Sequence, residues 1–238
     1  MGCILYADDI ILLSPSVTGL QQMLDKCSEV ATSISMAFNV NKSHCIVVGK
    51  FYNCVIAPMM LCGNYVQWCN SIKYLGVHLE SMRFDIGPCK RTFYSACNSI
   101  FTYGTAVDEL SLLTLQESCS LPVLMYAAPA LSFRSRQIDE MNVCWNNVIR
   151  RLFKYNKWES VKAVLLGLGR LNIRHLLMLR KINFYRRAFM SDNNVLHTVL
   201  MSFLMSGCDE MLTSVFMHKA AAVSLVHGRF ASYVCGGA

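Results

Sequence analysis

The sequence has no C-x-x-C pair, although it contains 12 cysteines among its 238 residues. Zinc knuckles and related sites need that spacing, so they are excluded. Scattered cysteines of this kind are typical of small apolar side chains in a protein core, and we expect no disulfide framework. The six histidines are dispersed in the same way, so neither residue type predicts a metal site.

Long apolar runs are missing as well. Residues 51–72 are uncharged but interrupted by turn residues, and residues 119–133 are too few to cross a bilayer, which takes about 20. The N-terminus has no basic residue before its apolar ones, which argues against a secretory signal. We therefore expect no membrane span and an intracellular location, in the nucleus or the cytoplasm.

Charged residues make up only 16% of the chain, whereas 54% are hydrophobic, and this composition excludes disorder as the main state. The formal net charge is nevertheless +7. Residues 150–187 carry a net +10 with a single acid, Glu159, which leaves −3 for the remainder. Such a segment suits a polyanionic partner.

Aromatic residues are interleaved with these cations, as expected where bases or sugars stack against a phosphate-binding surface. The alternative is a solvated helical face above a core stripe formed by Leu176, Leu179, Ile182 and Phe189. Both interpretations can hold on opposite sides of one helix. The cations expected to bind nucleic acid are Arg150, Arg151, Lys154, Lys157, Arg174, Arg180, Lys181, Arg186 and Arg187.

The hydrophobic period predicts an α+β fold with two parts. Residues 3–7 and 10–13 are apolar runs that predict a buried hairpin, followed from residue 17 by an amphipathic helix capped by Ser16. Extended character over 38–48 and short strands over 54–79 complete a first domain, 1–85. The second domain, 86–238, is expected to be helical, with helices at 90–103, 110–126, 137–153, 174–190 and 195–204.

The hairpin tip carries two adjacent carboxylates, Asp8 and Asp9. Two carboxylates about 4 Å apart repel by about 4 kcal/mol at an effective dielectric constant of about 20, so a nearby cation is expected. Mg²⁺ prefers such oxygen ligands and can bridge them to substrate phosphates. A solvated Asp-Asp turn is the alternative, and the spacing alone leaves both open.

The segment Cys-Ile-Leu-Tyr-Ala-Asp-Asp-Ile-Ile-Leu-Leu at 3–13 resembles the Y-x-D-D hairpin of reverse transcriptases, in the form found in non-LTR (LINE-type) retrotransposons. Asn-Val-Asn-Lys-Ser at 39–43 resembles the next family motif, N-x-x-K-[ST]. Lys-Tyr-Leu-Gly-Val at 73–77 resembles the Y-L-G box of the primer grip. The resemblance therefore implies a partial palm over 1–85 and a helical thumb-like or connection region over 86–238.

The resemblance also implies roles for single residues in RNA-directed DNA polymerisation, a nucleotidyl transfer. Asp8 and Asp9 would be catalytic carboxylates at a Mg²⁺ site, and Lys42 would assist the departing pyrophosphate. The expected partners are an RNA template, a DNA primer and a dNTP. The residues expected to bind the primer are Tyr6, Tyr74, Leu75 and Gly76. Lys42 as a solvated turn lysine, and Tyr74 and Leu75 as sheet core, are the alternatives.

The family also needs an aspartate on a strand upstream of the hairpin, and fingers that bind template and dNTP. The sequence given begins five residues before Tyr6. We therefore expect a carboxy-terminal fragment of a reverse transcriptase that is inactive alone, because one hairpin cannot supply the whole two-metal site. The alternatives are a basic helical module that binds nucleic acid without chemistry, and a nonfunctional truncated relic.

Overall fold

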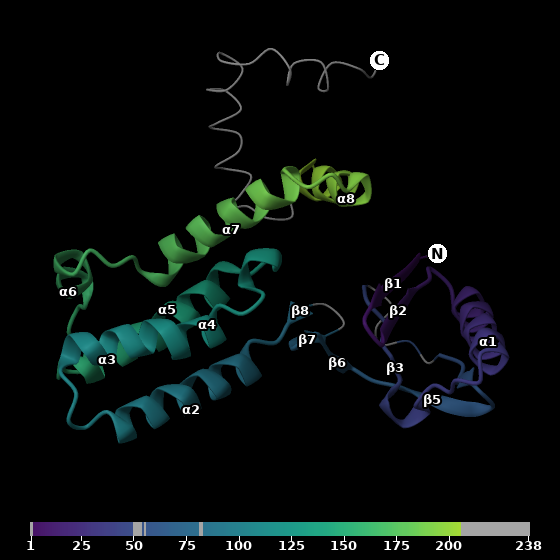
Figure 1. Ribbon diagram of the computed structural model, residues 1–238, viewed down its shortest axis with the longest axis horizontal. Coiled ribbons are helices and arrows are strands. Elements are labelled where there is room, and N and C mark those ends of the chain that lie inside the picture. The colour runs from purple at the N-terminus through teal and green to yellow at the C-terminus, as the bar shows by residue number, and fades with distance from the viewer. Residues whose placement is uncertain (1, 50–53, 55, 81–82, 206–238) are drawn as a thin grey trace, which may run out of the picture. The chain divides into compact units, whose positions relative to one another are not determined.

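The computed structural model describes residues 2–49, 54, 56–80 and 83–205 (Figure 1). The chain divides into two compact units, Met1–Asp85 and Ile86–Ala238. The division falls where the hydrophobic period of the sequence changes. The first unit combines one described helix with small sheets and the described part of the second is helical, so the fold is mixed α+β.

Three small sheets make up most of the first unit. β1 and β2 form an antiparallel pair, β3, β5 and β4 form a sheet in which β3 runs parallel to β5, and β6, β7 and β8 form an antiparallel sheet. The elements are β1 (Gly2–Tyr6), β2 (Asp9–Leu13), α1 (Val17–Ser33), β3 (His44–Cys45), β4 (Met59–Leu61), β5 (Asn64–Trp68), β6 (Ser71–Tyr74), β7 (Val77–Glu80) and β8 (Arg83–Phe84).

Two-residue loops close the hairpins. In β6–β7, Leu75 and Gly76 both have a positive φ, of 45° and 77°, which matches the right-handed twist of the flanking strands. In β1–β2, the loop is Ala7 and Asp8, and Ala7 has a φ of 52°. A side chain is strained at positive φ, so Leu75 and Ala7 would not adopt this conformation by themselves. The paired strands on both sides of each loop hold them in it.

The helix α1 begins at the predicted cap, since the backbone N–H of Gly19 donates to Oγ of Ser16 at 3.1 Å. One face of α1 packs against the β3–β5–β4 sheet. Gln21 fastens this contact, because its amide donates to and accepts from the backbone of Met60, both at 2.9 Å. The buried residues of this small core are Leu24, Cys45, Met59, Leu61 and Val66.

The prediction that the β1–β2 hairpin is buried is wrong. Ile4, Leu5 and Leu13 are 50%, 67% and 51% exposed. Among the described residues β1 and β2 pair only with each other, and a lone two-stranded ribbon has too little surface around it to bury its apolar side chains. Only Leu12 of β2 packs against the core of the unit.

The extended segment expected over 38–48 is also shorter than predicted. A 3₁₀ turn occupies Val40–Lys42, and only His44–Cys45 is a strand. The turn forms because the side-chain oxygen of Asn39 accepts a hydrogen bond from the backbone N–H of Lys42 at 3.2 Å. Such local side-chain bonds compete with strand pairing.

The second unit contains helices close to each predicted range and one, α6, that was not predicted. A π-helical turn, Gln116–Ser120, separates α3 from α4 within the range expected as one helix. The helices are α2 (Gly87–Tyr103), α3 (Glu109–Leu115), α4 (Leu121–Leu124), α5 (Ser135–Leu152), α6 (Lys162–Gly167), α7 (Ile173–Phe189) and α8 (Asn194–Met205).

The core of this unit lies among α2, α3, α4, α5 and the start of α7, which lie side by side in Figure 1. Phe93 of α2 and Trp145 of α5 are 0% and 2% exposed. The buried π-helical turn satisfies its own polar groups, because Oγ of Ser120 donates to Oε1 of Gln116 at 2.6 Å and the Gln116 amide donates to the Cys97 carbonyl. The unit therefore has a packed, hydrogen-bonded interior.

The described ranges also bear on the expectations of no membrane span and no disulfide framework. None of their helices combines the length and the apolar character needed to cross a membrane. Their cysteines are free thiols, and burial raises the pKa of Cys45, Cys89 and Cys97 above that of an exposed thiol. These thiols therefore stay protonated and behave as apolar groups.

Candidate nucleic-acid interface

The tip of the β1–β2 hairpin presents the two adjacent carboxylates to solvent. Asp8 lies in the two-residue loop, and Asp9 begins β2 directly opposite Tyr6, the last residue of β1. All three residues are exposed, Tyr6 to 61%. The loop length thus places one aromatic ring and two carboxylates at the same end of a ribbon.

The described residues supply only part of a magnesium site. Asp8 and Asp9 offer carboxylate oxygens, which suit Mg²⁺. Within the ranges that the structure describes, no group of three or more His, Cys, Asp or Glu side chains lies close enough to hold a metal ion. A two-metal centre needs more ligands than two adjacent carboxylates. Magnesium binding by Asp8 and Asp9 therefore stays a prediction.

The other residues expected around the primer lie on separate elements. Lys42 is exposed at the end of the 3₁₀ turn. Tyr74 ends β6, and Leu75 and Gly76 form the β6–β7 loop. In the described part of the unit, β1–β2 and β6–β7 belong to different sheets with no extensive packing between them. Among the described residues, no common sheet therefore joins Tyr74 to Asp9, and a joint role of the two segments at a primer stays a prediction.

Three of the nine cations expected to bind nucleic acid form hydrogen bonds or ion pairs within the helical unit, although their side chains are exposed or partly exposed. Nε of Arg150 donates to the backbone carbonyl of Glu159 at 2.9 Å. Nη1 of Arg151 donates to Oδ1 of Asn98. Arg174 forms an ion pair with Asp139 at 2.7 Å. These arginines join one helix to another helix or loop, so each has a structural role whether or not it also contacts a phosphate.

The loop after α5 exposes both charge and an aromatic ring. Trp158 is 86% exposed, and Nζ of Lys157 lies 4.9 Å from its ring centroid. Lys154 is 85% exposed, and its only carboxylate neighbour in the described residues is Glu109 at 3.9 Å. An exposed tryptophan beside lysines is the arrangement on which an unpaired base can stack while its phosphate is neutralised.

The prediction that Lys181 binds nucleic acid is wrong, because Lys181 is only 2% exposed. On α7 the buried side chains are Ile173, Leu177, Lys181, Tyr185 and Ala188. Of the expected core stripe, Leu176 and Phe189 are partly buried against hydrophobic cores, whereas Leu179 is 47% exposed. Lys181 shares a face with its neighbours four residues away on either side, so its side chain packs in the interior.

The remaining cations of α7 face solvent at least in part. Arg186 and Arg187 are exposed and Arg180 is partly exposed. No acidic side chain of the described residues forms an ion pair with any of the three. Arg180 and Arg187 are seven residues apart and therefore share one flank of the helix. Arg186 and Arg187, the two that are fully exposed, are the most available of the three to a polyanion.

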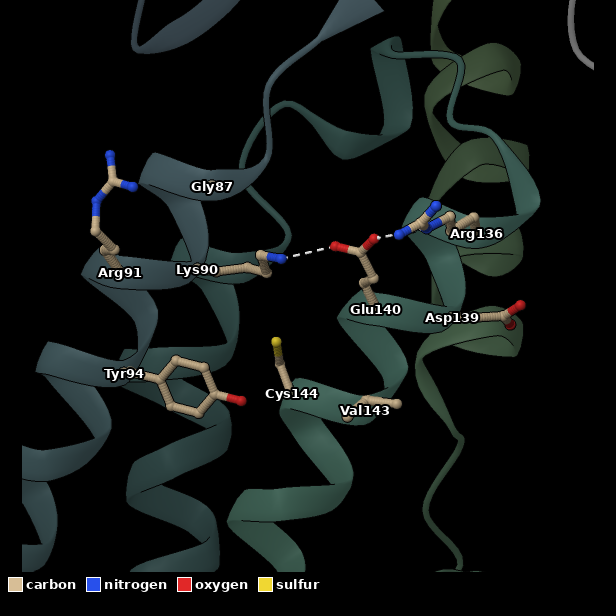
Figure 2. Close-up of a pocket in the computed structure, with 9 residues that line it drawn as sticks. All are labelled: Gly87, Lys90, Arg91, Tyr94, Arg136, Asp139, Glu140, Val143 and Cys144. Atoms are coloured by element: carbon tan, nitrogen blue, oxygen red, sulfur yellow. Dashed lines mark hydrogen bonds and ion pairs between the residues drawn. The ribbon is translucent and has the colours of Figure 1, made fainter.

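Sequence reasoning missed a group of cations between α2 and α5. Figure 2 shows Lys90 of α2 and Arg136 of α5 pointing at the carboxylate of Glu140. Lys90 Nζ lies 2.7 Å from Glu140 Oε2, and Arg136 Nε lies 3.4 Å from Oε1. Residues 86–149 contain more acids than bases, so the stretch as a whole shows no excess of positive charge. Folding brings these cations together across 46 residues of chain.

Comparison of the chain with family models, with curated proteins and with solved structures returns no match. The assignment of function therefore depends on the residues and geometry described above.

Proposed function

We propose that this chain is the part of a non-LTR retrotransposon reverse transcriptase that runs from the Y-x-D-D hairpin into the thumb, and that it binds nucleic acid without polymerising alone. The observation that carries the proposal is the two-residue hairpin that presents Tyr6, Asp8 and Asp9 together at one exposed tip. A Y-x-D-D box acts through its aromatic and acidic side chains at a nucleic-acid end, so they must be accessible.

The helical unit supports the binding part of this proposal. Trp158 offers a stacking surface with Lys157 beside it, Lys154 is exposed on the same loop, and Arg186 and Arg187 add unneutralised charge. Stacking contributes about 1–3 kcal/mol per base, and each phosphate contact adds a salt-dependent contribution. An RNA–DNA hybrid or its single-stranded overhang is the partner that combines both features.

Binding without polymerisation is proposed because Asp8 and Asp9 have no third metal-ligating side chain close to them among the described residues. In-line phosphoryl transfer needs both attacking and leaving oxygens to be neutralised by correctly held ions. A hairpin with two carboxylates does not by itself supply that arrangement.

Primer extension combined with hybrid binding tests the proposal. The full chain is incubated with a fluorescent DNA primer annealed to an RNA template, with Mg²⁺ and dNTPs. We expect binding that weakens steeply with salt, and no extension. Asp8→Asn should leave binding unchanged. Extension that Asp8→Asn abolishes would refute the claim of inactivity, and an absence of binding at low salt would refute the claim of binding.

The exposed hairpin favours a second candidate, a nonfunctional relic whose first unit does not fold stably. Ile4, Leu5 and Leu13 would expose apolar surface that promotes aggregation. Urea unfolding followed separately by circular dichroism and by light scattering distinguishes the two candidates. A relic should aggregate or lose structure without a cooperative transition.

A further inference from the structure

An open pocket of about 840 Å³ lies between α2 and α5 at the surface of the helical unit (Figure 2). Sites for small ligands have volumes of about 300–1,000 Å³, so this pocket is large enough for a nucleotide-sized group. Its lining includes Lys90, Arg91 and Tyr94 from α2, and Arg136 and Glu140 from α5. Figure 2 shows Lys90, Glu140 and Arg136 in a row, with the Tyr94 hydroxyl pointing toward Cys144.

The pocket has more positive than negative charge. The hydrogen bond and the positive charge of Lys90 hold the pKa of Glu140 below its usual range, so Glu140 is ionised at neutral pH. One carboxylate is therefore shared by two cations. Arg91 is exposed, and in the described ranges no carboxylate pairs with it. Lys90, Arg91 and Arg136 against Glu140 leave a surplus of two positive charges.

The neighbouring acid does not remove this surplus. Asp139 lies at the edge of the pocket, but its carboxylate is paired with Arg174 at 2.7 Å. The pocket also adjoins the first turn of α2, which contains no acidic residue and whose cap position, Ile86, makes no side-chain hydrogen bond. The positive end of the helix dipole therefore adds to the attraction that the three cations exert on an anion.

We propose that this pocket binds a phosphate ester, with Lys90 and Arg136 as its cations and Glu140 as an internal counterion that the phosphate displaces. Arg91, whose guanidinium points away from Lys90 and Glu140 in Figure 2, adds positive charge at the rim of the pocket. The ester could come from a nucleic-acid backbone, in which case the inference rests on the proposed function, or from a free nucleotide. In either case Lys90 and Arg136 exchange the Glu140 carboxylate for the phosphate, and Arg91 gains an anionic partner.

The position of the pocket agrees with a backbone phosphate. Glu140 and Arg151 are eleven residues apart on α5, which is about 16 Å at about 1.5 Å per residue. A strand of a duplex advances about 3.4 Å per phosphate, so about five phosphates span this length. A strand that enters the pocket and follows α5 therefore reaches the loop that carries Lys154 and Trp158.

The test compares charge variants of the full chain with a fluorescein-labelled 20-nucleotide RNA and, separately, with ADP. Glu140→Gln removes the internal competitor and should tighten binding about fivefold, as expected for one charge at about 4 Å in water. Arg91→Ala should weaken it by a similar factor and leaves both ion pairs of Glu140 intact. The matched control is Glu117→Gln, which also removes one acid but breaks the Arg170–Glu117 ion pair outside the pocket.

The outcomes separate the pocket from the proposed function. A larger change in affinity for Glu140→Gln and Arg91→Ala than for Glu117→Gln supports the pocket. If only the affinity for RNA changes, the ligand is a backbone phosphate. If the affinity for ADP changes, the ligand is a nucleotide. Equal responses to Glu140→Gln and Glu117→Gln overturn it, because only net charge then matters. RNA binding that the pocket variants leave unchanged overturns the pocket but not the proposed function. ADP binding that depends on the pocket residues, without RNA binding, overturns the proposed function but not the pocket. Binding of neither ligand overturns both.

Discussion

The guanidinium carbon of Arg151 lies 4.2 Å from the centroid of the Phe101 ring, and its Nη1 donates to the side chain of Asn98. Phe101 and Asn98 both lie on α2, whereas Arg151 is in the last turn of α5. The same two helices are joined at their other ends by Lys90 and Glu140. Since Lys90 precedes Asn98 and Glu140 precedes Arg151, α2 and α5 run in the same direction.

The first prediction concerns this contact. Arg151→Ala should lower the free energy of unfolding by about 1–2 kcal/mol, because it removes a cation–π contact and a hydrogen bond. Arg186→Ala, on an exposed side chain of α7, should change it by less than about 0.5 kcal/mol. Urea unfolding of the three proteins measures both values. Equal stability of Arg151→Ala and the parent chain would contradict a structural role for Arg151.

The second prediction concerns the salt dependence of nucleic-acid binding. If Arg186 and Arg187 each contact one phosphate, replacing both by alanine should reduce the slope of log K against log salt by about 2. Fluorescence anisotropy with an RNA–DNA hybrid at several salt concentrations gives the slope. An unchanged slope would show that α7 does not face the phosphates.

The third prediction separates Lys181 from its basic neighbours. Because Lys181 is buried, Lys181→Ala removes packed side-chain atoms and should destabilise the protein by about 1–3 kcal/mol. The salt slope of binding should match that of the parent chain. A smaller slope with unchanged stability would instead place the ammonium group at the phosphates.

The contrast between Lys181 and the arginines around it shows what sequence could reveal about α7. Apolar residues occur on all sides of this helix, so Leu176, Leu179 and Ile182 fit a core stripe as well as Ile173 and Leu177 do. Which side becomes buried depends on where α5 and other helices pack. That information is not contained in the helix itself.

The same reasoning applies to the candidate sites. The Tyr6–Asp9 hairpin was predictable because a two-residue loop between apolar strands is a local feature. The exposure of its strands was not, since it depends on which other strands pair with them. The α2–α5 pocket was also missed, because Lys90 and Arg136 lie in the stretch 86–149, which contains more acids than bases as a whole, and they meet only in the folded unit.

The fourth prediction concerns the loop of the Y-L-G segment. Leu75 has a φ of 45°, which costs a non-glycine residue about 1–2 kcal/mol, and asparagine tolerates this conformation better. Leu75→Asn should therefore raise the stability of the first unit, whereas the β-branched Leu75→Val should lower it. Thermal unfolding compares the two variants. If Leu75→Asn also weakens binding to a primed template, then the leucine contributes to function at the expense of stability.

The fifth prediction is a pH dependence that arises from Glu140. Its pKa is lowered in the folded chain by Lys90, so the folded state favours the ionised form. The resulting stabilisation is present above the unfolded pKa, about 4.3, and is lost as pH falls through the lower folded pKa. The difference in unfolding free energy between the parent chain and Glu140→Gln should shrink over that range. A difference that stays constant down to pH 3 would contradict the ion pair.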